Sequence, residues 1–211
     1  MKTLKPFFYG LLLFAAAGCA TTARVTSSWS LPQPPANAMN KVLVLGVFRN
    51  MEQKQQIEEA MASTLNQTGI RAQSAFSLFG PNGFRGLGEE EIVNRLQGSD
   101  FTSVMIVSLI DKEQTQNYIP GNYYASPHVV GYNRFYRRYI IVNDWMYTPG
   151  YYTTNTTYVL QAEIYTIKGD ELVYSAQTQS YDPANYRDLA VAFSKSIVAE
   201  LQSKGLAPMI R

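Results

Sequence analysis

Two runs of almost uninterrupted apolar residues constrain the fold of this chain more than any other feature. They are Val42–Phe48 and Val104–Ile110, and polar residues flank both. Apolar runs of this length are typical of strands buried on both faces, as in parallel sheets that helices cover on each side. The runs therefore predict a sheet with parallel neighbours at the centre of the domain.

Helical patterns separate the two runs. Asn50 is the expected N-cap of a first helix, with Gln53 in a capping-box position, and the helix should stop before Gly69. A short strand over 70–76 and a second helix over 88–97 follow, which completes a βαβαβ order. The residues expected to face the core are Ile57, Met61 and Leu65 in the first helix and Ile92, Val93 and Leu96 in the second.

The carboxyl-terminal part predicts a hairpin and a closing helix. Its strands are expected at about 157–167 and 172–180, joined by the turn Lys168–Glu171. Asp182 is the expected N-cap of the helix, with Pro183 at its first position. The helix carries apolar residues at four-residue steps: Leu189, Phe193, Ile197 and Leu201. We therefore predict one α/β domain over 41–211, α+β in its second half, with one mixed sheet of about five strands.

The amino end has the residue order of a secretory signal. Lys2 and Lys5 precede the uncharged run Phe7–Ala17, which is too short for a membrane-spanning helix of about 20 residues. Ala16-Ala17-Gly18-Cys19 resembles the lipobox of bacterial lipoproteins. The resemblance implies that residues 1–18 are removed and that Cys19 carries diacylglycerol and palmitate-type acyl chains. It also implies an outer-membrane, periplasmic-face location, because Ala20 stands where an Asp would retain the protein at the inner membrane.

Residues 19–40 are expected to form the lipidated end and a tether. Pro32–Pro35 is proline-rich and should be extended and semi-rigid. As an alternative, residues 24–29 could add an edge strand to the sheet.

Charge and cysteine content exclude several classes of protein. Loss of Lys2 and Lys5 brings the 18 basic residues level with the 16 acidic ones, so nothing favours binding to nucleic acid. Cys19 is the single cysteine, so the domain has no internal disulfide.

A tyrosine-rich segment over 117–152 is the most unusual feature. Tyrosine and tryptophan combine a flat apolar face with a hydrogen-bonding edge, so the segment could stack on sugar rings or on a partner protein. The alternatives are a loop or β-arm that covers the sheet as a lid, and a membrane-inserting hairpin, which the clustered arginines disfavour. The expected contact residues are Tyr123, Tyr124, Tyr132, Arg134, Tyr136, Arg137, Arg138 and Trp145.

Catalytic and cofactor signals are weak. The glycines over 80–88 lack phosphate-loop spacing, and His128 is the single histidine, with no GxSxG motif to accompany it. Asp111 and Glu113 share a strand face and are expected at a solvated strand end. We predict no enzyme activity, no cofactor and no metal; the alternative of a glycan hydrolase would need a carboxylate pair in a cleft, drawn from Asp111, Glu113, Asp144 and Glu163.

The order of elements supports a second resemblance. Leu160–Tyr165 and Leu172–Ala176, within the predicted hairpin, are its most characteristic stretch. The chain resembles small bacterial outer-membrane lipoproteins whose α/β domain is similar to those of the curli-secretion lipoprotein, the penicillin-binding-protein activators and the amino-terminal domain of TolB. The resemblance implies a binding or adaptor role in the envelope, with an oligomeric secretion or assembly component as the alternative.

Overall fold

The computed structural model describes residues 23–84, 86, 88–133 and 138–209, which form two compact units. The first, here called the body, runs to Lys112 and resumes at Thr157; the second, here called the ribbon, is Glu113–Thr156. Cys19 and the rest of the predicted signal lie outside the described residues.

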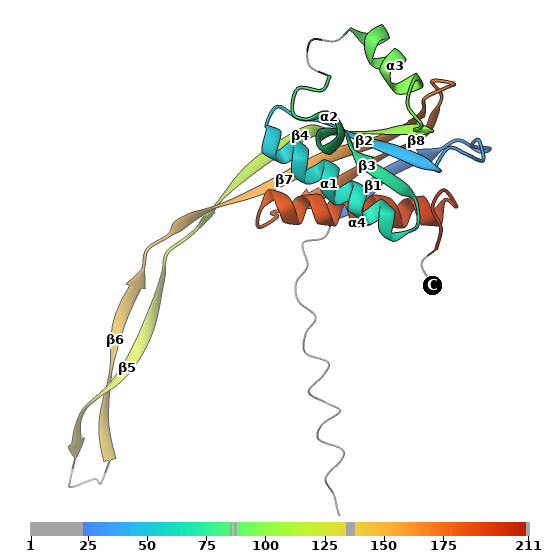
Figure 1. The fold of residues 1–211 in the computed structure, drawn as a ribbon. Helices are drawn as coiled ribbons and strands as arrows, with labels where there is room; N and C mark the ends of the chain where they lie inside the picture. The colour runs from blue at the N-terminus through green and yellow to red at the C-terminus, as the bar shows by residue number, and fades with distance from the viewer. Residues whose placement is uncertain (1–22, 85, 87, 134–137, 210–211) are drawn as a thin grey trace, which may run out of the picture. The chain divides into compact units, whose positions relative to one another are not determined.

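Eight strands and four helices are described (Figure 1). In chain order they are β1 (Ala23–Ser30), β2 (Lys41–Val47), α1 (Met51–Gln67), β3 (Arg71–Ser74), α2 (Ala75–Phe79), α3 (Glu89–Gln97), β4 (Ser103–Ile119), β5 (Asn122–Asn133), β6 (Arg138–Thr148), β7 (Tyr151–Thr166), β8 (Leu172–Tyr181) and α4 (Tyr186–Ser203).

The main sheet is mixed and has the order β1-β8-β7-β4-β2-β3. Strand β2 is parallel to β3 and to β4, whereas β8 is antiparallel to β1 and to β7. The α/β class, the parallel centre and the carboxyl-terminal hairpin are thus confirmed. The sheet has six strands rather than about five. The additional strand is β1 at one edge, in agreement with the alternative that residues 24–29 form an edge strand.

Because β1 pairs with β8, the tether expected over 19–40 does not include residues 23–30. The Ser196 hydroxyl donates to the Ala23 carbonyl at 2.6 Å, and the Ser28 hydroxyl donates to Glu200 Oε1 at 2.6 Å. Ala38 is also buried, and its carbonyl accepts from the Ser103 hydroxyl. Residues 23–30 and Ala38 are therefore part of the body.

Helices cover the two faces of the parallel strands. Helices α1 and α4 lie side by side against one face (Figure 1), where they share a core with Val42 and Val44. Leu43 points to the opposite face and joins Leu96 of α3 in a second cluster. The inward residues predicted for α1 and α4 are all buried, and each contributes about 1.5–3 kcal/mol by leaving water.

Several local predictions need correction. The strand expected over 70–76 ends at Ser74, because the Ser74 hydroxyl accepts from the Ser77 N–H and starts α2. The closing helix begins at Tyr186 rather than after Asp182, because the Asn185 side chain caps it by accepting from the Asp188 N–H at 2.9 Å. Val93, expected to face the core, is 38% exposed. Asn50 is the N-cap of α1, as predicted.

The strand expected to end at Ile110 continues to Ile119, and its neighbour in the sheet, β7, begins at Tyr151. Asp111 and Glu113 are exposed, as expected, but they lie within β4 and not at a strand end. Most of the tyrosine-rich segment is therefore β structure.

Candidate functional site

The ribbon is the candidate functional site. Its strands β5 and β6 are antiparallel, and their register pairs Tyr123 with Tyr147, Ala125 with Trp145 and Pro127 with Asn143. Residues directly opposite each other on an antiparallel pair share one face of it. These six residues form what we call the aromatic face.

The aromatic face is open to solvent and carries no charge. Trp145 is 72% exposed, Tyr123 is 65% exposed, and the rings of Tyr123 and Tyr147 lie 4.8 Å apart between centroids. The pairs on the opposite face are Tyr124 with Met146 and Ser126 with Asp144. The ribbon thus has one apolar aromatic face and one mixed face.

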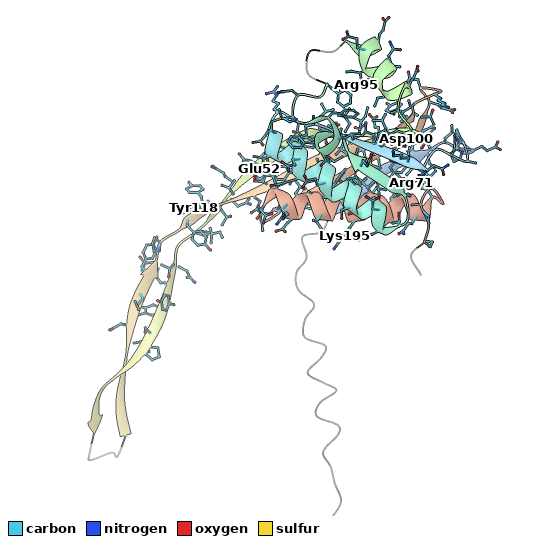
Figure 2. All side chains as sticks on the ribbon, viewed as in Figure 1. Glu52, Arg71, Arg95, Asp100, Tyr118 and Lys195 are labelled. Carbon is cyan, nitrogen blue, oxygen red and sulfur yellow. The ribbon has the colours of Figure 1, made fainter. Side chains whose placement is uncertain are left out.

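Two Tyr-X-Pro-Gly sequences mark the points where β4 passes into β5 and β6 into β7. They are residues 118–121 and 147–150. A proline lacks an N–H, so the ladder of backbone hydrogen bonds is interrupted at both. Tyr118 (labelled in Figure 2) packs on Gly150, and its ring centroid lies 5.0 Å from that of Tyr152, with the two rings tilted by 48°.

Tyr147 occupies the equivalent position on Gly121, where an added Cβ would lie 2.5 Å from the tyrosine hydroxyl. Each glycine thus makes room for a tyrosine ring of the neighbouring strand. Sequence reasoning missed these junctions, although the repeated Tyr-X-Pro-Gly sequence was a visible signal for them.

The structure divides the residues predicted to form one surface. Tyr123 and Trp145 share the aromatic face, whereas Tyr124 lies on the other face, because consecutive strand residues point in opposite directions. Tyr132 is paired with Tyr139, and Arg138 with Asn133, near the end of the ribbon. Arg134, Tyr136 and Arg137 lie outside the described residues.

The four carboxylates considered for catalysis do not come from one unit. Asp111 and Glu163 belong to the body, whereas Glu113 and Asp144 belong to the ribbon. Glu163 is half-buried and accepts from the Gln161 side chain at 2.7 Å; the other three are exposed. His128 pairs with Val142 in the ribbon register. In the described part of the chain, no group of three or more His, Cys, Asp or Glu residues could hold a metal ion.

Glu58 is a fully buried carboxylate that sequence reasoning missed. Its Oε1 accepts from the Gly46 N–H at 2.8 Å, and its Oε2 accepts from the Ser74 hydroxyl at 2.8 Å and from the Phe76 N–H at 2.6 Å. Lys54 Nζ lies 3.9 Å from Oε1. Both oxygens are thus engaged in joining α1 to β2 and α2, so we assign Glu58 a structural role.

A groove of about 650 Å³ runs between α1 and the edge of the sheet at β3 and α2. Its polar lining is made of amide and hydroxyl side chains, among them Asn66, Gln73 and Ser77, with Glu59 as its carboxylate. These groups can form hydrogen bonds with a ligand. Ser74 also lines the groove, where its hydroxyl donates to the buried Glu58 carboxylate.

Comparisons with known proteins identify no family. No protein-family model matches the sequence, and no curated protein matches it. One similar solved structure is the PelC dodecamer from Paraburkholderia phytofirmans, at 13% identity over 83% of this chain and 95% of that chain, with a TM-score of 0.42. Another is lipoprotein GNA1162 from Neisseria meningitidis, at 11% identity over 77% of this chain and 98% of that chain, with a TM-score of 0.41. Across the described residues, no helix is both long and apolar enough to cross a membrane.

Proposed function

We propose that this protein is a lipid-anchored, non-catalytic binding module of the bacterial cell envelope, and that its aromatic face holds a partner protein. The observation that carries the proposal is the solvent exposure of Trp145, Tyr123 and Tyr147 on one uncharged face of the ribbon. Exposed apolar surface of this kind is costly in water and marks interaction sites.

The composition of the aromatic face favours a protein over a glycan as the partner. The centres of protein interfaces are rich in tyrosine, tryptophan and methionine and poor in charge. Asn143 is the one side chain of this face that is polar throughout; the remainder are aromatic rings, Ala125 and Pro127. A glycan site would need more hydrogen-bonding groups beside its rings.

The anchor is supported by the sequence alone. The short apolar run and the lipobox-like residues before Cys19 indicate acylation of the Cys19 thiol after removal of residues 1–18. Two or three acyl chains would hold the protein at the membrane, since each buried methylene contributes about 0.8 kcal/mol. The outer membrane and its periplasmic face remain part of the proposal.

A non-catalytic role is supported by the structural engagement of Glu58, whose two oxygens accept hydrogen bonds from the Gly46 N–H, the Ser74 hydroxyl and the Phe76 N–H. Glycosyl transfer needs a carboxylate pair enclosed in a cleft, whereas Asp111, Glu113 and Asp144 are all exposed to solvent.

Affinity capture from crosslinked envelopes tests the binding surface. Trp145→Ala should lower recovery of co-purifying protein at least about tenfold, as for an aromatic residue central to an interface. Tyr124→Ala and Met146→Ala, which change the opposite face, are matched controls and should recover the same partners as the unchanged protein. Equal recovery with Trp145→Ala would reject the surface, and retention on purified peptidoglycan instead of protein would reject the partner class.

Metabolic labelling with palmitate tests the anchor separately. The unchanged protein should incorporate label and fractionate with the outer membrane, and Cys19→Ser should do neither. An unlabelled protein would remove the anchor and the location but would leave the aromatic face as a binding surface.

A further inference from the structure

The edge strand β1 fixes the point at which the chain enters the body. It begins at Ala23, which is 5% exposed and pairs with Ser180 of β8. On the side of α4, the Ser196 hydroxyl donates to the Ala23 carbonyl at 2.6 Å. Ala23 is therefore held at one edge of the main sheet by both a strand and a helix.

The distance from this edge to the proposed anchor is short. Ala23 comes four residues after Cys19, and four residues span at most about 14 Å when fully extended. That span is little more than the diameter of one helix with its side chains, about 10–12 Å. The opposite edge of the sheet, at β3, is five strand spacings from β1, or about 24 Å. Acyl chains on Cys19 would therefore hold the β1 edge, and not the β3 edge, close to the bilayer.

Four exposed side chains beside this edge form what we call the β1 margin: Arg24, Trp29, Tyr181 and Lys195. Trp29 is 47% exposed near the far end of β1, and Tyr181 is 64% exposed at the end of β8, next to the partner of Ala23. Lys195 (labelled in Figure 2) precedes Ser196 in α4. Tryptophan and tyrosine are enriched at membrane–water interfaces, and lysine and arginine are attracted to anionic headgroups. The margin thus combines the residue types that suit a lipid surface.

The charge of the β1 margin supports the same partner. Its two charged residues are both basic. Beside β1, the Glu200 carboxylate accepts from the Ser28 hydroxyl at 2.6 Å and lies 3.8 Å from Lys204 Nζ, which offsets its charge. The neighbouring helix α1 instead exposes the carboxylates of Glu52 and Glu59. An anionic surface would therefore attract the margin and repel the exposed side of α1.

We propose that the β1 margin rests on the anionic phospholipid headgroups of the membrane that carries the anchor. The inference rests on the proposed acylation of Cys19, because the anchor sets the distance between body and bilayer. Trp29 and Tyr181 contact the headgroup region near opposite ends of β1, so the strand lies along the surface and does not point away from it. The partner of this site is lipid, whereas the aromatic face is proposed to hold a protein.

Quenching of tryptophan fluorescence by brominated phospholipid tests the contact. Trp29 and Trp145 are the two tryptophans of the chain, so in Trp145→Phe the emission comes from Trp29 alone. In acylated protein reconstituted into vesicles that contain phosphatidylglycerol, we expect bromination of the lipid to quench this emission. The matched control combines Trp29→Phe, Trp145→Phe and Gln73→Trp, which places the single tryptophan at an exposed position of β3; its emission should not change.

The same samples separate this inference from the anchor. Palmitate-labelled protein with an unquenched Trp29, or with equal quenching at position 73, would overturn the membrane contact and leave the anchor in place. An unlabelled protein would overturn the anchor and, with it, this inference.

Neutralising the basic residues tests the headgroup chemistry. In the Trp145→Phe background, Arg24→Gln and Lys195→Gln should each lower the ratio of docked to undocked protein, taken from the quenched fraction, about fivefold. Arg71→Gln on β3 (labelled in Figure 2) is the matched control and should leave the ratio unchanged. Vesicles of phosphatidylcholine alone should have the same weakening effect as removal of the charges. A ratio that depended neither on Arg24 and Lys195 nor on phosphatidylglycerol would overturn the assignment of anionic headgroups as the partner.

Discussion

Body and ribbon share two strands, β4 and β7, but these strands are buried very differently along their lengths. In the body, Met105 and Val107 of β4 and Leu160 and Ile164 of β7 are fully buried. In the ribbon, Tyr118 of β4 is 56% exposed and Tyr152 of β7 is 71% exposed.

The difference follows from what covers each stretch. The body's strands lie under helices and gain about 1.5–3 kcal/mol for each buried apolar side chain. The described ribbon contains strands only, so it depends on cross-strand pairs of about 0.2–1 kcal/mol each. The body can therefore carry the stability of the protein, while the ribbon keeps its aromatic side chains available for contact.

The largest expected effect is in the body. Glu58→Ala leaves the N–H groups of Gly46 and Phe76 and the Ser74 hydroxyl without their acceptor. We expect the free energy of unfolding to fall by about 3–5 kcal/mol, measured by urea denaturation. Glu59→Ala, at the exposed neighbouring position, should change it by less than about 0.5 kcal/mol. A small effect of Glu58→Ala would mean that the body does not depend on this buried carboxylate.

The next effect should be confined to the ribbon. In Gly121→Ala, the new Cβ would lie 2.5 Å from the Tyr147 hydroxyl and 2.6 Å from the Thr148 carbonyl oxygen. The backbone must shift to remove this clash, which should destabilise the ribbon by about 1–3 kcal/mol. Hydrogen exchange of the ribbon amides should therefore become faster. Asn122→Ala, one residue further along, serves as control. If body amides exchanged faster as well, the two units would not be independent in stability.

A smaller effect is expected where the body's edge is capped. Asn66→Ala removes both hydrogen bonds to Ala72 and should lower the free energy of unfolding by about 1–2 kcal/mol. The uncapped edge of β3 should also promote association, seen as concentration-dependent light scattering. Gln67→Ala is the control, and unchanged scattering with Asn66→Ala would show that the cap does not protect this edge.

The smallest effect concerns a buried hydroxyl. Tyr174 is fully buried, and within the described residues its hydroxyl has no hydrogen-bond partner. Tyr174→Phe should therefore change stability at pH 7 by less than about 1 kcal/mol, towards greater stability. A clear loss, measured by urea denaturation, would reveal a partner for the hydroxyl.

Alkaline pH should enlarge this difference. Burial, and to a lesser extent the charge of Glu200, raises the pKa of Tyr174. Tyr174 therefore stays protonated in the folded state when it ionises in the unfolded chain, so the stability it contributes below about pH 10 is lost as pH rises further. Tyr174→Phe should lose less stability between pH 9 and 11, by up to about 1.4 kcal/mol per pH unit, whereas Tyr181→Phe at an exposed position should not differ from the unchanged protein.

The sequence predicted the structure best where the spacing of apolar residues indicates which side chains are buried. The run Val42–Phe48 and the four-residue steps of α1 and α4 predicted strands and helices correctly, because a buried face must be apolar. The predicted N-cap of the closing helix was wrong: Asn185, and not Asp182, caps α4. Asp and Asn are both good N-cap residues, so the choice between them depends on the tertiary structure.

The candidate site was only partly predictable. Abundant tyrosine drew attention to residues 117–152, but composition alone does not reveal which residues share a face. That division required the register of Tyr123 with Tyr147 and of Tyr124 with Met146. Glu58 was unpredictable for another reason, because a glutamate within a polar helical sequence is usually exposed.

The alternation of faces along the ribbon also limits how this hairpin can change during evolution. Inserting one residue into a strand would transfer every following side chain to the other face, which would scatter the rings of Tyr123, Trp145 and Tyr147. A single extra residue can be held only as a bulge, as between Val129 and Gly131, so insertions or deletions that keep the ladder regular add or remove two residues in each strand together. With a regular ladder, the reach of the hairpin therefore changes in increments of about 6.8 Å, so relatives of this protein should fall into discrete length classes.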